Sequence, residues 1–258
     1  MNDKRIKEMK KIILIVLGLC TFLTAKSQDI KVHQSFENLA EVKLPDFNKI
    51  SIKYDPTISY VIAKKMKDLE SDYNNTFPYD YSGDCEGEYG WLMLKTKLDI
   101  KTDKYYYIVF MICPETEFFI YEEGNEKPID RLYALNLVIP GNGSIYTSGH
   151  TCNFDVRQKF ELSKGKFLEV KQPYYYVGLK SRTLNTINIY QTKECKKIVA
   201  TLPKNYEIEV LLTEESFTDP STPSLYLVRT SFGLVGWAKL KVGQYESVDV
   251  DGLFYNND

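Results

Sequence analysis

Residues 225–240 read LYLVRTSFGLVGWAKL, and this stretch decides the fold of the C-terminal third of the chain. Aromatic and β-branched side chains on both sides of Ser231 favour strands, because such residues fit a pleated and half-buried surface. Gly233 and Gly236 can adopt the positive φ that sharp turns require. The sequence therefore predicts two short strands joined by a tight turn, with Trp237 available to fill a small core.

Strand-like runs continue upstream of this stretch, at residues 184–190, 198–205 and 206–212. Together these runs resemble the bacterial SH3-like (SH3b) domain over residues 177–242. The most specific part is RTSFGLVGWA at residues 229–238, which matches the family's glycine-rich ending with its Gly-Trp pair. Asn205 stands where the family prefers glycine, and asparagine tolerates a left-handed turn nearly as well. The resemblance implies a small SH3-like β-barrel.

The resemblance also implies a class of function. Domains of this family usually bind cell-wall peptides or glycopeptides, or act as noncatalytic docking modules. The candidate ligand-binding residues of this chain are Tyr190, Tyr226, Arg229 and Trp237. Each has an ordinary alternative, because Trp237 can serve core packing, Arg229 can be a solvated strand charge, and scattered surface tyrosines are common.

Residues 28–176 precede this domain, and the sequence predicts one helix among them. Asp55 is a suitable N-cap and Pro56 suits the first helical position. Apolar residues then recur at steps of three and four, namely Ile58, Ile62, Met66, Leu69 and Tyr73. We therefore expect a helix near residues 56–73.

The rest of residues 28–176 is typical of an antiparallel sheet, with runs at 91–100, 105–113, 118–121 and 132–139 and a hairpin at 160–170. The expected fold class is mainly β with one helix (α+β), followed by the barrel, with an acidic tail at residues 243–258. Two tyrosine triplets, at residues 105–107 and 174–176, should each send their outer rings to one face of a strand. Such exposed tyrosines could form a platform for a sugar or a peptide.

Composition excludes several classes of protein. The chain has 258 residues, with 33 Lys+Arg against 35 Asp+Glu and a formal net charge of -2. This balance is not that of a nucleic-acid binder, and 43% hydrophobic residues exclude a disordered chain. Only two histidines are present, and no metal, cofactor or dinucleotide motif occurs. We expect no cofactor and no metal.

The N-terminus predicts export. Lys10 and Lys11 precede an apolar run at residues 12–23, and Ala25 and Ser27 frame a cut before Gln28. The sequence thus predicts a signal peptide at residues 1–27, a periplasmic or secreted protein, and no stable membrane span after cleavage. An uncleaved anchor or lipidation at Cys20 are the alternatives, and Met9 is a second candidate start.

Four cysteines remain after the cut, and export permits a disulfide among Cys85, Cys113 and Cys152, with Cys195 as a free thiol. Four buried free thiols are the alternative.

A catalytic alternative uses one of these thiols. The order Asp84-Cys85-Glu86-Gly87 and then Gly149-His150 resembles the nucleophile and histidine motifs of NlpC/P60-like cysteine peptidases, which act on cell-wall peptides. However, Glu86 replaces the family's serine, and its negative charge raises the pKa of the thiol. No residue to orient His150 can be assigned. The sequence therefore favours a noncatalytic, exported binding module whose partner is a cell-wall peptide, a glycan or an envelope protein.

Overall fold

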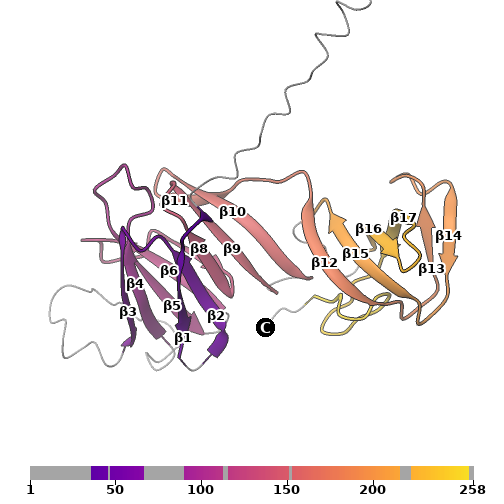
Figure 1. Ribbon diagram of the computed structural model, residues 1–258, viewed down its shortest axis with the longest axis horizontal. Helices are drawn as coiled ribbons and strands as arrows, with labels where there is room; N and C mark the ends of the chain where they lie inside the picture. Colours follow the sequence, from indigo (N-terminus) through magenta and orange to yellow (C-terminus); the bar gives the residue numbers. More distant parts are fainter. Residues whose placement is uncertain are drawn as a thin grey trace, which may run out of the picture. The chain divides into compact units, whose positions relative to one another are not determined.

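A computed structural model describes residues 36–45, 47–66, 90–112, 116–150, 153–215 and 222–255, without the side chains of Asn48 and His150. The chain divides into two units, residues 1–37 and 38–258. Every regular element of the described residues is a strand of the second unit, and the strands form three sheets (Figure 1).

Two of the sheets share one core. Sheet I has the order β1 (Ala40–Leu44), β2 (Phe47–Tyr54), β8 (Asn136–Ile139), β9 (Ser144–His150), β10 (Asp155–Ser163) and β11 (Lys166–Glu169). Sheet II has the order β3 (Ser59–Lys65), β4 (Gly90–Thr96), β5 (Tyr106–Ile112), β6 (Thr116–Glu122) and β7 (Asp130–Tyr133). Ile52 and Leu137 of sheet I lie in the same buried cluster as Ile108 and Phe110 of sheet II. The two sheets therefore pack face to face over apolar side chains.

Sheet III forms the C-terminal part. Its order is β12 (Tyr175–Arg182), β15 (Glu207–Thr213), β16 (Ser224–Thr230), β17 (Val235–Leu240), β13 (Ile187–Tyr190) and β14 (Ile198–Leu202). One face carries a buried cluster that includes Ile189, Val210 and Val228. Val250 and Leu253, from the residues after β17, are fully buried in the same cluster. The boundary between a domain at 28–176 and one at 177–242 stays a prediction.

The predicted helix is wrong. Residues 59–65 form strand β3, which pairs with β4, and no helix occurs in the described part of the chain. The apolar residues misled the prediction because a step of four returns to the same face of a strand as well as of a helix. Ile62 and Met66 do pack in one cluster, but they reach it from the end of a bulged strand. Asp55 caps a turn, accepting the Thr57 backbone N–H at 2.8 Å. Residues 67–73 lie outside the described residues.

The predicted barrel is also wrong. Sheet III begins at β12 and ends at β14, and these two strands do not pair with each other, so the sheet stays open. The turn chemistry was predicted correctly in part, because Gly233 has a φ of 97° and Asn205 a φ of 66°. Gly236 serves another purpose. A Cβ at that position would lie 2.7 Å from the Tyr190 carbonyl oxygen, so glycine permits close pairing of β17 and β13.

Other local predictions are confirmed. The hairpin of β10 and β11 pairs Ser163 with Lys166 across a turn that contains Gly165. Both tyrosine triplets alternate as expected, since Tyr106 and Tyr175 are buried while their neighbours are half-buried or exposed. The predicted signal peptide and Cys85, Cys113 and Cys152 lie outside the described residues. In the described ranges, no helix is long and apolar enough to cross a membrane.

Candidate ligand-binding face

The two faces of sheet III differ sharply in exposure. One face packs on the buried cluster. The other face, here called the outer face, carries a row of apolar side chains that lie directly opposite one another on successive strands. This outer row takes one residue from each strand: Tyr176, Leu212, Leu227, Trp237, Tyr190 and Ile198. Tyr176 is 56% exposed and Ile198 is 51% exposed, and the four between them are half-buried.

A lysine sits over the aromatic part of this row. The Lys193 ammonium lies 4.8 Å from the centre of the Trp237 ring and 5.3 Å from that of Tyr174. It also forms an ion pair with Glu214, and the hydrogen bond to this carboxylate raises the pKa of Lys193. Four separate segments, which carry Tyr174, Lys193, Glu214 and Trp237, thus bring two rings and one pair of charges together beside the row.

A second cation lies at the Tyr176 end of the row. The Arg157 guanidinium, from β10, lies 5.4 Å from the centre of the Tyr176 ring. Positive charge is therefore present at the Tyr176 end of the row and beside Trp237 within it, and both cations stand over the face of a ring.

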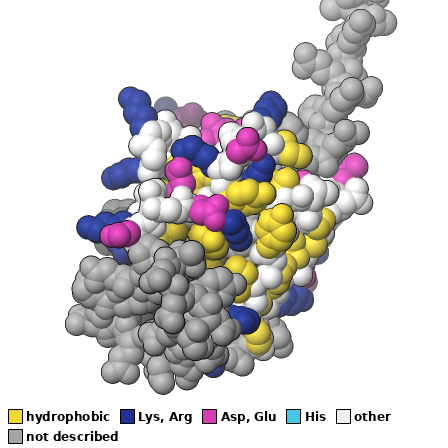
Figure 2. All heavy atoms as spheres, turned by 90° about the vertical axis from the view of Figure 1, so that its left-hand side faces the viewer, with side chains coloured by type: hydrophobic (Ala, Val, Ile, Leu, Met, Phe, Trp, Pro, Cys, Tyr) yellow, Lys and Arg dark blue, Asp and Glu magenta, His cyan; other side chains and the backbone are white. Residues whose placement is uncertain are grey.

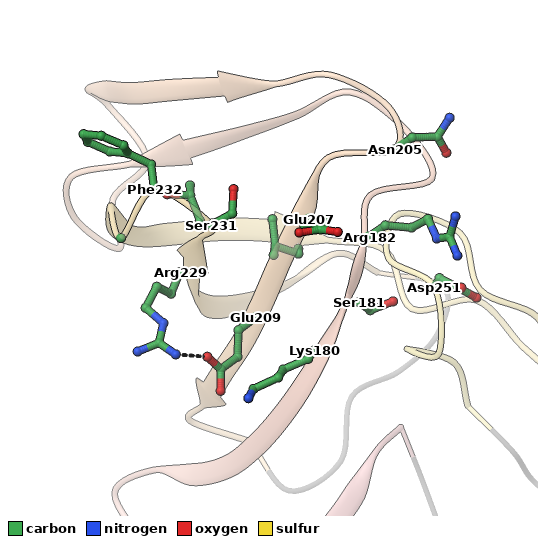
Figure 3. A pocket seen from close by; sticks show the side chains of 13 residues that line it. Lys180, Ser181, Arg182, Asn205, Glu207, Glu209, Arg229, Ser231, Phe232 and Asp251 are labelled. Carbon is green, nitrogen blue, oxygen red and sulfur yellow. Dashed lines mark hydrogen bonds and ion pairs between the residues drawn. The ribbon is translucent and has the colours of Figure 1, made fainter.

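A charged cavity adjoins the outer row on the same face. Lys180, Glu209 and Arg229 lie opposite one another on β12, β15 and β16, one row further along the strands. Arg182 and Glu207 form the next opposite pair. These residues line a cavity of about 800 Å³, shown in Figure 3, where Arg229 and Glu209 form an ion pair.

The structure brings together three of the four predicted ligand-binding residues. Tyr190 and Trp237 lie opposite each other in the outer row, and Arg229 lies on the same face in the charged cavity. Tyr226 lies on the other face of β16 and is fully buried in the core.

Sequence reasoning did not connect Lys193, Tyr174 and Tyr176 with this face. The alternation of the triplet at residues 174–176 was the one signal for the two tyrosines, which are 45% and 56% exposed. Nothing in the sequence predicted a role for Lys193, because its contacts form only when the loop between β13 and β14 packs beside the end of β15.

A second group of tyrosines lies on sheet II, on the face that is turned away from the shared core. Lys95 lies 4.8 Å from the ring centre of Tyr105 and 5.4 Å from that of Tyr107, and it forms an ion pair with Glu123. Figure 2 looks at the molecule from the side on which sheet II lies in Figure 1 and shows hydrophobic side chains interspersed with both signs of charge. Much of this face is buried, including Leu92, Val109 and Met111.

The catalytic alternative gains no support from these contacts. Cys85 lies outside the described residues, and of His150 only the backbone, at the end of β9, is described. The pair therefore stays a prediction. Among the described residues, no group of three or more histidine, cysteine or acidic side chains is placed to hold a metal ion.

Comparisons with known proteins do not identify a family for this chain. A scan of protein-family models, a search of curated proteins and a search of solved structures each found no match to this chain. The resemblance to SH3-like domains in residues 177–242 thus stays a prediction from the sequence.

Proposed function

We propose that this protein is an exported, noncatalytic binding module of the bacterial envelope, and that its outer face binds a cell-wall peptide or glycan. The observation that carries the proposal is the outer row, a line of apolar and aromatic side chains that crosses all six strands of sheet III. Export rests on the predicted signal peptide, and the envelope ligand rests on the resemblance to SH3-like domains.

The chemistry of the row suits such a ligand. Trp237 and Tyr190 offer flat apolar rings with one polar edge each, which suits the apolar face of a sugar or the backbone of a peptide. Lys193 and Glu214 stand beside the rings and can contact polar groups of the same ligand. An apolar surface rimmed by charged residues is typical of a ligand or protein interaction site.

The experiment measures retention of the full mature chain on purified, insoluble cell wall. Trp237→Ala should lower the retained fraction at least about tenfold, because a central aromatic residue often dominates binding. Tyr133→Ala is the matched control, since Tyr133 is an aromatic residue on β7 that is 44% exposed. Its retention should equal that of the unmodified chain.

Circular dichroism and thermal unfolding of both variants establish that they are folded. If folded Trp237→Ala protein is retained as well as the control, the outer row is not the binding surface and the proposal fails.

A further inference from the structure

The charged cavity beside the outer row is lined by equal numbers of cations and carboxylates. Three cations, Lys180, Arg182 and Arg229, line it together with three carboxylates, Glu207, Glu209 and Asp251. The formal charges cancel, so the cavity does not select for one sign of ligand. Figure 3 shows these six side chains around one hollow, with Arg182 and Asp251 near each other and Lys180, Glu209 and Arg229 grouped elsewhere along it.

Only one pair of these charges is matched within the cavity. Arg229 pairs with Glu209, whose side chain is just 13% exposed. Lys180 and Arg182 form no ion pair with any described residue, and the same holds for the side chains of Glu207 and Asp251. Two cations and two carboxylates on neighbouring strands and loops are therefore exposed to solvent without an ion-pair partner among the described residues.

We propose that this cavity binds a zwitterionic ligand, a peptide with a free ammonium and a free carboxylate, while the rest of the ligand lies on the outer row. The ammonium meets Glu207 or Asp251, and the carboxylate meets Lys180 or Arg182, in charge-assisted hydrogen bonds. This inference rests on the proposed function and names the chemical class of the ligand. Because all four groups are solvated, the affinity of a small probe should be only millimolar.

The test uses L-alanyl-L-alanine as the probe and follows the backbone amide resonances of the full mature chain by NMR. The dipeptide should shift the amides of Arg182 and Glu207 with a millimolar dissociation constant. The N-acetylated dipeptide and the C-amidated dipeptide should each bind about tenfold more weakly, because each lacks one charge. No shift with the free dipeptide, or equal binding of all three probes, would overturn the inference.

A matched pair of variants assigns the effect to the cavity. The double variant Lys180→Gln/Arg182→Gln should weaken binding of the free dipeptide about tenfold and leave the C-amidated form unchanged, because that form has no carboxylate. Lys101→Gln is the control, because Lys101 is an exposed cation outside the cavity. Equal weakening in both variants would overturn the assignment.

The two proposals fail in distinguishable ways. Loss of cell-wall retention in Trp237→Ala, together with no dipeptide binding, supports the proposed function and overturns the charged cavity. Dipeptide binding together with unchanged retention of Trp237→Ala supports zwitterion binding in the cavity, but contradicts the proposed function and the placement of the rest of the ligand on the outer row.

Discussion

The two tryptophans of the chain lie in opposite settings. Trp91 is 4% exposed in the core between sheets I and II, with the Phe47 and Phe110 rings 5.9 and 6.4 Å away. Trp237 is half-buried on the outer face of sheet III, with Lys193 over its ring. The Trp91 ring is enclosed by its packing, whereas part of the Trp237 ring stays exposed to solvent.

The same contrast holds for the sheets that carry them. Strand β5 of sheet II is buried on both faces, so its sequence is a continuous apolar run. Strand β16 of sheet III alternates, with Tyr226 and Val228 buried and Arg229 exposed. Because β16 alternates, one face of sheet III stays exposed and can contact a ligand.

The largest expected effect is on stability. Trp91→Ala should lower the free energy of unfolding by about 3–5 kcal/mol, because it leaves a cavity in a packed core. Trp237→Ala should lower the free energy of unfolding by only about 1–2 kcal/mol, because folding of the chain buries less of the apolar area of this half-buried ring. Urea unfolding of both variants measures the difference. Equal decreases in the free energy of unfolding would contradict the difference in burial between Trp91 and Trp237.

A second prediction concerns alkaline pH. Burial raises the pKa of Tyr121, on β6, from 10.0 to about 12. The folded protein therefore keeps this proton between pH 10 and 12, where the unfolded chain loses it. The stabilisation is complete below pH 10 and disappears as the pH rises through about 12, a loss of about 2–3 kcal/mol.

Tyr121→Phe isolates this effect from those of the other tyrosines. Stability measured from pH 9 to 12 should fall more steeply in the unmodified chain than in the variant. Parallel curves would show that sheet II does not bury this hydroxyl as described.

A smaller effect tests the geometry of the outer row. Gly236→Ala should lower the free energy of unfolding by about 1–3 kcal/mol, because the new Cβ would contact the Tyr190 carbonyl oxygen and force β17 from β13. Lys239→Ala, at an exposed position of the same strand, should change stability by less than about 0.5 kcal/mol. If Gly236→Ala is as stable as this control, Trp237 and Tyr190 are not held opposite each other.

Local patterns made part of this structure predictable. The hairpin turn at Gly165 and the positive φ of Asn205 follow from backbone preferences of single residues. The placement of Tyr106 and Tyr175 on the face opposite their neighbouring tyrosines follows from strand periodicity. Such features are set by neighbours in sequence.

Features that depend on distant contacts were not predictable. The spacing of Ile58, Ile62 and Met66 fits both a strand and a helix, and pairing with β4 decides between them. The burial of Tyr226 and the exposure of Trp237 likewise depend on which face of sheet III meets the core. The sequence thus predicted Tyr190 and Trp237 of the candidate site. Lys193 and the charged cavity could be identified only from the strand order of sheet III.

Acrylamide quenching of tryptophan fluorescence tests the central claim that the outer face of sheet III is the ligand surface. The measurement uses the Trp91→Phe variant, in which Trp237 is the single tryptophan, with and without soluble cell-wall fragments. A bound ligand should cover the ring and lower its quenching by acrylamide, while Trp237→Phe protein, which keeps only the buried Trp91, shows no change. Fragments that bind without altering the quenching of Trp237 would contradict the account.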